Sequence, residues 1–174
     1  MLETEATCPL CGDRRSSLFE ARRFMDVEVR YRLCGRCGFV FQSPRMSGEA
    51  LEGFYAHEYR LVYQDKAGPT EKDLLVQQKR AEHTIAFLSD RIDRVDRFLD
   101  IGSSAGILLE KMKGRFECLA CGVEPGEAYR RFASDKGLEI YATLDELASA
   151  QTGPFDLVSM MHVLEHLADP VGYL

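Results

Sequence analysis

The chain has 174 residues, of which 45% are hydrophobic and 29% charged, a composition typical of folded globular proteins rather than disordered ones. No apolar run approaches the roughly 20 residues that a membrane span needs. The N-terminus lacks the basic start and apolar stretch of a secretory signal, which predicts a cytoplasmic location. Residues 1–45 carry eight Lys/Arg and six Asp/Glu, against 14 and 22 in the remainder. The acidic remainder disfavours nucleic acid as a partner, although an N-terminal contact stays open.

The six cysteines form three Cys-x-x-Cys pairs, and the first two pairs are each followed by glycine. Two such turns present four sulfurs in the tetrahedral array that structural zinc prefers. We therefore predict a zinc ribbon over residues 1–45, with Zn²⁺ held by Cys8, Cys11, Cys34 and Cys37. Thiol redox chemistry and unrelated cysteines are the alternatives.

Short alternating apolar runs between these pairs indicate a small stack of β-hairpins. About 45 residues bury too little apolar surface to fold unaided, so a metal has a physical reason to be present. Four thiolates leave no open position for a substrate, so the predicted role of the metal is structural.

The third pair, Cys118 and Cys121, lies in an apolar run expected to form a buried strand over 116–124. Residues three apart on a strand point to opposite faces, which predicts two inert core cysteines rather than a second metal or redox pair.

Residues 46–92 are predicted to form a helical connector. Ser47 can cap a short helix that ends near Tyr55, and residues 56–70 have the composition of a loop. Apolar residues at helical spacing then predict an amphipathic helix over 71–92.

Strand and helix patterns alternate through residues 93–174, which predicts a Rossmann-like α/β domain with a parallel sheet of about four strands. The expected strands are 97–101, 116–124, 138–141 and 155–160. The expected helices are 105–113, 126–136, 144–150 and one that begins at 165.

A glycine loop, Gly102–Gly106, follows the first of these strands and resembles a ligand-binding turn. Asp100 at the strand end disfavours a pyrophosphate and favours a cationic group. Glu124 ends the second strand, 22 residues after Gly102, a position suited to ribose hydroxyls. S-adenosylmethionine fits this combination better than a nicotinamide dinucleotide does.

These segments, together with His162-Val-Leu-Glu-His166-Leu-x-Asp-Pro, resemble the class I S-adenosylmethionine-dependent methyltransferases. The front end resembles a bacterial branch with an N-terminal zinc ribbon whose members often act on sugars or other small metabolites. The resemblance implies that S-adenosylmethionine contacts Asp100, Gly102, Ser103, Gly106, Glu124, Pro125 and His162. Ser104 stands where many relatives have glycine, which predicts a less permissive backbone there.

The family sheet normally has seven strands, so the domain is expected to be truncated at its C-terminus. An exposed edge at strand 155–160 would then favour self-association. The resemblance also implies that His166 and Glu165 lie near the acceptor, with His166 as a general base. A structural role for this pair and a metal site with His162 are the alternatives.

The leading functional hypothesis is methyl transfer to a small molecule, a sugar or nucleotide-sugar. RNA methylation with the ribbon as the docking element is a second hypothesis. An inactive fragment that binds cofactor or a partner is a third, and Asp100 disfavours a fourth, an oxidoreductase.

Overall fold

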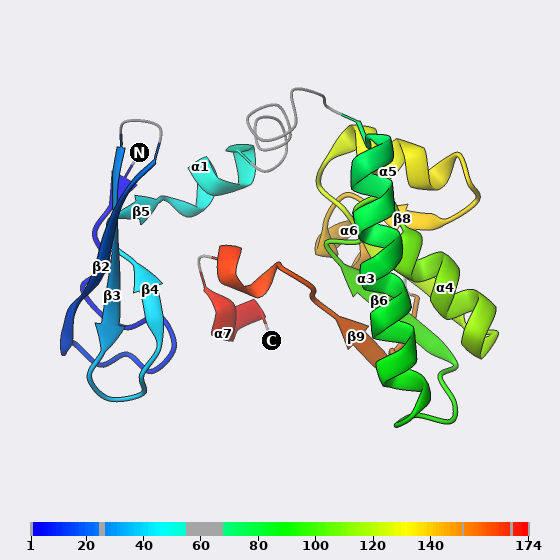
Figure 1. The fold of residues 1–174 in the computed structure, drawn as a ribbon, viewed down its shortest axis with the longest axis horizontal. Coiled ribbons are helices and arrows are strands. Elements are labelled where there is room, and N and C mark those ends of the chain that lie inside the picture. The colour runs from blue at the N-terminus through cyan, green and yellow to red at the C-terminus, as the bar shows by residue number, and fades with distance from the viewer. Residues whose placement is uncertain (1, 25–26, 55–67, 151, 168, 174) are drawn as a thin grey trace. The chain divides into compact units, whose positions relative to one another are not determined.

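The computed structural model describes residues 2–24, 27–54, 68–150, 152–167 and 169–173 (Figure 1). They form two compact units, residues 1–53 with 164–174, and residues 54–163. None of the described helices combines the length and apolarity needed to cross a bilayer.

The first unit is built on short antiparallel strands. Strands β2 (Ser16–Phe24), β3 (Val27–Cys34) and β4 (Val40–Gln42) form one sheet in that order, and β1 (Leu2–Glu3) pairs with β5 (Arg45–Met46). This confirms the predicted hairpin stack. Among the described residues of this unit, the one cluster of buried apolar side chains consists of Cys8, Cys34 and Phe41. Such a small core is consistent with a unit that needs a staple.

Helix α1 (Gly48–Gly53) begins after Ser47, whose hydroxyl accepts a hydrogen bond from the Ala50 amide at 3.4 Å. The expected cap is therefore present. Most of the expected loop over 56–70, and the predicted helix end at Tyr55, lie outside the described residues.

The expected continuous helix from Glu165 is wrong. The segment forms a 3₁₀ turn, η2 (Leu164–His166), and a separate short helix, α7 (Pro170–Tyr173). Pro170 disfavours helical backbone at the residue before it, but is itself well suited to the first helical position.

The second unit begins with α3 (Glu71–Ser89) and continues as alternating strands and helices. Its four strands are β6 (Arg97–Ile101), β7 (Leu119–Val123), β8 (Glu139–Tyr141) and β9 (Leu157–Ser159). Its later helices are α4 (Ile107–Phe116), α5 (Glu127–Ser134) and α6 (Leu144–Ser149). All strand pairs are parallel and the sheet order is β8-β7-β6-β9 (Figure 1). The predicted Rossmann-like sheet is confirmed.

Two boundaries differ from the prediction because of left-handed backbone. Gly106, at φ +75°, ends the loop, so α4 begins at Ile107 rather than 105. Helix α4 runs through Phe116, and Glu117 at φ +53° turns the chain, so β7 begins at Leu119 rather than 116.

The sheet has an apolar cluster on each face. Phe98 and Ala120 pack with Leu109 and Met112 of α4 on one face, while Leu99 and Val123 pack with Leu147 of α6 on the other. Cys118 belongs to the first cluster and Cys121 to the second. Burial raises the pKa of both thiols, that of Cys121 to about 11. The prediction of inert core cysteines on opposite faces is therefore confirmed.

Strand β9 pairs with β6 on one side and is the last strand of the described sheet. Its central residue, Val158, is 47% exposed. Self-association through strand 155–160 stays a prediction.

Candidate functional site

The second unit has a topological switch point between β6 and β9. Successive strands β6, β7 and β8 extend the sheet in one direction, and the connection through α6 then returns the chain to the other side of β6. Open α/β sheets bind ligands at the carboxyl ends of the strands beside such a point.

Asp100 and Ser159 meet at this point. They are register partners on β6 and β9, and the Ser159 hydroxyl donates to Asp100 Oδ1 at 2.5 Å. Asp100 is only 4% exposed. Burial raises the pKa of its carboxyl to about 7, with the nearby charge of Glu124 acting in the same direction and the Ser159 hydrogen bond opposing it. A cationic ligand group here would offset the energetic cost of burying the ionised carboxylate and would lower the pKa of Asp100 again.

The loop from Gly102 to Gly106 is folded back onto β7. The amides of Gly102 and Ser103 both donate to the Val123 carbonyl, at 2.8 and 3.0 Å. Gly102 and Gly106 have φ of +78° and +75°. A Cβ at Gly106 would lie 2.4 Å from Leu138 Cδ1, so a larger residue here would force Leu138 to move as well as adopting a left-handed backbone, and the position favours glycine. The ten-residue helix α4 starts directly after it.

Ser104 also lies in the left-handed region, at φ +50°. The expectation of a less permissive backbone at this position is therefore wrong. The loop keeps a conformation that suits glycine although the residue is serine, at a cost of roughly 1 kcal/mol.

Glu124 follows β7 and is 5% exposed. Its carboxylate accepts the Ser104 amide at 2.9 Å through Oε2 and the Gly126 amide at 2.8 Å through Oε1. Two backbone donors thus fix a buried carboxylate beside the glycine loop, with its orientation set by both the loop and the entrance to α5.

No motif in the sequence singles out Gln77 of α3 as part of this site. Its Oε1 accepts the Ala105 amide at 3.2 Å, and among the residues that the structure describes its buried Nε2 has no hydrogen-bond partner. The same absence of a motif holds for Ser159. Neither residue belongs to a recognisable motif, and only the packing of α3 and β9 against the loop and β6 reveals them.

The remaining residues predicted for the site do not gather at one place around the glycine loop. Ser103 is 4% exposed and its hydroxyl is packed against Gly122, whereas Pro125 is exposed. His162 is exposed at φ +58°, three residues beyond β9. Glu165 and His166 belong to η2 of the other unit, and their catalytic role stays a prediction.

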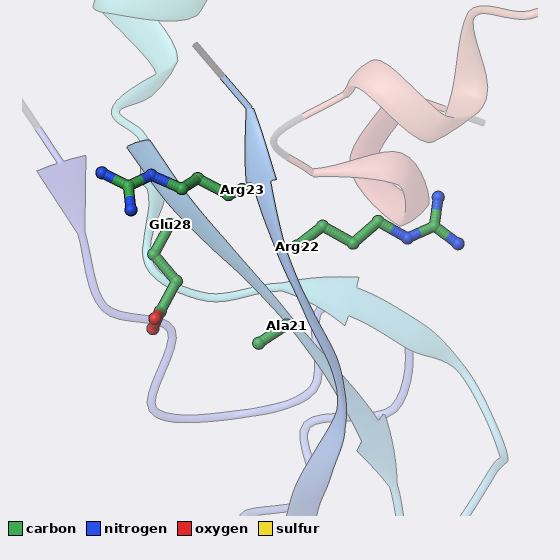
Figure 2. A pocket seen from close by; sticks show the side chains of 4 residues that line it. All are labelled: Ala21, Arg22, Arg23 and Glu28. Carbon is green, nitrogen blue, oxygen red and sulfur yellow. The ribbon is translucent and has the colours of Figure 1, made fainter. Parts of the chain in front are cut away.

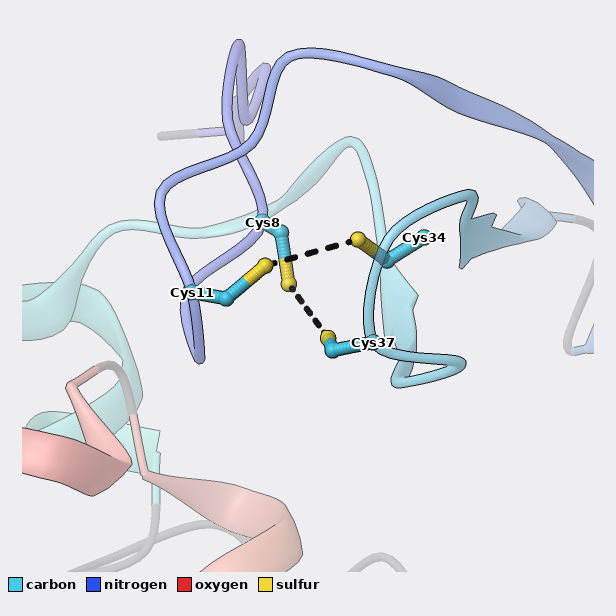
Figure 3. A group of neighbouring side chains, drawn as sticks. All are labelled: Cys8, Cys11, Cys34 and Cys37. Atoms are coloured by element: carbon cyan, nitrogen blue, oxygen red, sulfur yellow. Dashed lines mark hydrogen bonds between the residues drawn. The ribbon is translucent and has the colours of Figure 1, made fainter.

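The first unit holds a group of four thiols. The Sγ atoms of Cys8, Cys11, Cys34 and Cys37 all lie within 4.8 Å of one another (Figure 3). Those of Cys8 and Cys37 are 3.7 Å apart, and those of Cys11 and Cys34 are 3.6 Å apart. A disulfide needs about 2.05 Å, whereas the edges of a tetrahedral zinc–thiolate site are about 3.8 Å.

Backbone donors also support a thiolate in this group. The amides of Cys37 and Arg36 lower the pKa of Cys34 to about 6, and the Arg36 amide lies 3.4 Å from its sulfur. Burial and hydrogen bonds from neighbouring thiols raise the pKa of Cys11 and Cys37, so the stabilisation is confined to Cys34. The donor set and its spacing fit a tetrahedral zinc ion.

A hollow on the β2–β3 hairpin, lined by Ala21, Arg22, Arg23 and Glu28, does not form a second site. Figure 2 shows Arg22 and Arg23 extending to opposite sides of the hairpin, as neighbours on a strand do. Arg22 pairs with Glu20 at 2.7 Å. The lining side chains do not converge on a ligand.

Residues 76–174 match the profile of a family described as a methyltransferase domain. The chain belongs to this methyltransferase family. The match covers β6, the glycine loop, Glu124 and β9, and it confirms the resemblance to class I S-adenosylmethionine-dependent methyltransferases drawn from the motifs.

Among curated relatives, the chain is 38% identical over 85 residues to the ubiquinone biosynthesis O-methyltransferase of Hahella chejuensis, covering 45% of this chain and 35% of that one. It is 34% identical over 113 residues to the enzyme of the same name from Dinoroseobacter shibae, covering 61% and 45%. The chain thus spans between a third and a half of the length of these relatives.

Two solved structures are also similar. Magnesium protoporphyrin IX methyltransferase from Synechocystis, with bound S-adenosylmethionine, is 19% identical with a TM-score of 0.48, over 71% of this chain and 65% of that one. A sugar N-methyltransferase from Streptoalloteichus is 24% identical with a TM-score of 0.35, over 47% and 35%.

Proposed function

We propose that the protein transfers a methyl group from S-adenosylmethionine to a small-molecule acceptor. The observation that carries this proposal is the pair of buried carboxylates, Asp100 and Glu124, on either side of a glycine loop at the switch point of a methyltransferase-family sheet. The ligand that suits the pair has a cationic group, hydroxyls and no pyrophosphate.

S-adenosylmethionine supplies a methyl group on a positively charged sulfur. In this proposal Glu124 accepts the ribose hydroxyls, the loop from Gly102 to Gly106 lies along the ligand, and Asp100 faces its cationic portion. The chain's contribution is mainly alignment of the donor and acceptor. As the motif resemblance implies, the proposed general base for the proton that the acceptor releases is His166, with Glu165 next to it in the sequence.

The acceptor class is a finer part of the proposal. The resemblance of the front end favours a sugar or nucleotide-sugar. The curated relatives are named for O-methylation in ubiquinone biosynthesis, so a phenolic acceptor is the competing small molecule.

We further propose that the four-cysteine group holds a structural Zn²⁺. The sulfur spacing and the buried position of Cys8 and Cys34 support this. All four ligands are thiolates, so the ion has no position for a substrate and serves to fold the ribbon.

RNA docking by the ribbon is less well supported. Ion pairs join Arg15 to Asp13, Arg22 to Glu20, Arg30 to Glu28 and Arg45 to Glu5, which neutralises much of the unit's positive charge. A phosphate-binding surface needs clustered, accessible cations.

The proposed reaction is tested by incubating the protein with methyl-labelled S-adenosylmethionine and separate panels of nucleotide-sugars, phenols and ribosomal RNA. We expect mass spectrometry to find the labelled methyl group on a nucleotide-sugar. Label in the phenols would change the acceptor class, and label confined to RNA would replace the proposal.

The ribose assignment is tested with Glu124→Ala and calorimetry of S-adenosylhomocysteine. Loss of one charge-assisted contact weakens binding by roughly 1.5–3 kcal/mol. The matched control is Glu127→Ala, because Glu127 is an exposed carboxylate three residues later, at the start of α5. Equal affinities of both variants and the parent would refute the role of Glu124.

A further inference from the structure

Another hollow in the first unit, which we call the arginine hollow, combines the size of a ligand site with a surplus of cationic side chains. Its volume is about 380 Å³, within the range of roughly 300–1,000 Å³ that small-molecule sites occupy. Its lining includes Glu5, Arg14, Ser16, Arg30, Arg32 and Ser43.

Strand geometry gathers the arginines of this hollow. Arg30 and Arg32 are two residues apart on β3, so their side chains leave the same face of the hairpin. Ser16 of β2 is the register partner of Cys34, which lies two residues beyond Arg32 on that face. Arg22 and Arg23, by contrast, are adjacent on β2 and extend to opposite sides (Figure 2).

Arg32 is held in place with a donor to spare. Its Nε donates to the Ser16 hydroxyl and its Nη2 to the Ser16 carbonyl, both at 2.8 Å. Within the described ranges, no hydrogen bond or ion pair involves Nη1 of Arg32 or the guanidinium of Arg14. A guanidinium that is already oriented loses little further freedom when it binds a ligand.

The acidic groups nearby leave the hollow positive. The carboxylate of Glu5 is paired with Arg45, and both side chains are about four-fifths buried. Arg30 pairs with Glu28, but both of these side chains are more than half exposed. An exposed ion pair of this kind contributes little, so a ligand can replace Glu28 at Arg30.

These cations select a ligand with more than one negative charge. The planar fork of arginine matches the oxygens of phosphate and forms two parallel hydrogen bonds with them. The hollow is too large to be filled by a single phosphate group. Its arginines also occupy one pocket rather than a track along the surface, which disfavours an extended nucleic-acid backbone.

We propose that the arginine hollow binds the diphosphate group of a small molecule, with Arg32 and Arg14 as its main contacts. This inference rests on the acceptor class proposed above, because a nucleotide-sugar carries a diphosphate. It concerns a site within the first unit that recognises the acceptor through its phosphates rather than through the atom that is methylated.

Calorimetry of the full chain with UDP, GDP and uridine tests the proposal. UDP and GDP share the diphosphate and differ in the base, so both should bind with similar affinity, whereas uridine should not bind measurably. Arg32→Gln should weaken UDP binding about tenfold or more, since it removes a charge-assisted contact. Arg14→Gln should weaken it about threefold or more, because an exposed cation contributes less.

Arg22→Gln is the matched control. It makes the same change in net charge on the same hairpin, but Arg22 lines the other hollow and pairs with Glu20. It should leave UDP binding unchanged. Arg14→Gln removes no hydrogen bond within the described ranges, so it reports on binding even if Arg32→Gln disturbs the fold.

Equal weakening by Arg22→Gln and Arg14→Gln would overturn the proposal, because it would reveal an effect of net charge alone. Absence of UDP and GDP binding to the parent would overturn it as well. Binding of an oligouridine RNA without binding of UDP would replace it with RNA docking. None of these results bears on the cofactor site, which is measured separately by the affinity for S-adenosylhomocysteine.

Discussion

The first unit, which holds the predicted zinc ribbon, and the second unit, which holds the parallel sheet, both contain Cys-x-x-Cys pairs. We call them the ribbon unit and the sheet unit. The backbone around the pairs brings the thiols together in one unit and separates them in the other. In the ribbon, two turns bring Cys8, Cys11, Cys34 and Cys37 within 4.8 Å of one another. In the sheet unit, Cys118 and Cys121 are divided between the two apolar faces. Spacing alone therefore does not define a metal site, because a turn makes the two thiols converge and a strand makes them diverge.

The two units are also stabilised differently. The ribbon buries few large side chains, whereas the sheet unit has a fully buried set that includes Phe98, Leu109, Met112 and Tyr129. The stability of the ribbon unit should therefore depend on a metal, and that of the sheet unit on side-chain packing. The two largest expected effects test these two dependences.

Chelation is expected to unfold the ribbon and leave the sheet unit folded. Structural zinc contributes on the order of 10 kcal/mol to such small domains. Native mass spectrometry should find one zinc per chain, absent in the double variant Cys34→Ser plus Cys37→Ser. Cys118→Ala plus Cys121→Ala should retain the zinc. Zinc loss in this second variant would show that Cys118 and Cys121 also contribute to metal binding.

The sheet unit should instead be sensitive to packing at the glycine loop. Gly106→Ala adds a Cβ 2.4 Å from Leu138 Cδ1 at a left-handed position, and should lower the free energy of unfolding by roughly 2–4 kcal/mol. The control is Gly114→Ala in the same helix, where the added Cβ meets nothing within 4 Å. Helix propensity makes that change stabilising by about 0.5–1 kcal/mol. Urea unfolding measures the free energy of unfolding of both variants. Similar changes in Gly106→Ala and Gly114→Ala would contradict the packing explanation.

Asp100 should make the stability of the sheet unit depend on pH. Its carboxyl has a pKa of about 7 when folded, above the unfolded value, so the folded state holds the extra proton. Stability from this group is complete below about pH 4 and is lost as the pH rises through 7. Between pH 5 and pH 8 it should fall by about 2–3 kcal/mol. Asp100→Asn should remove this decline, and the exposed Asp135→Asn should retain it. A decline that persists in Asp100→Asn would assign it to another group.

The smallest effect concerns Ser104. At φ +50° a serine is strained, so Ser104→Gly should raise the free energy of unfolding by about 0.5–1 kcal/mol, after the added flexibility of the unfolded chain is deducted. Ser134→Gly at the end of α5 should instead lower the free energy of unfolding, because glycine is a poorer helix former than serine. A destabilised Ser104→Gly would show that the serine side chain matters more than its backbone.

Much of this architecture is predictable from local patterns. The strand that precedes the glycine loop, the loop itself and the Cys-x-x-Cys-Gly turns are short-range features, and local patterns locate all of them correctly. Boundaries shifted where one residue took a left-handed backbone, as at Glu117, which no periodicity encodes. Gln77 and Ser159 could not be found because their role depends on which elements pack together across the fold.

We propose that the loop after β6 and the carboxylate after β7 form one cofactor site. Hydrogen exchange with and without S-adenosylhomocysteine measures this. Exchange should slow in residues 100–106 and 124–126 when the ligand binds, with the amides of residues 1–45 unchanged. Protection confined to the ribbon, or no protection in either segment at saturating ligand, would contradict it.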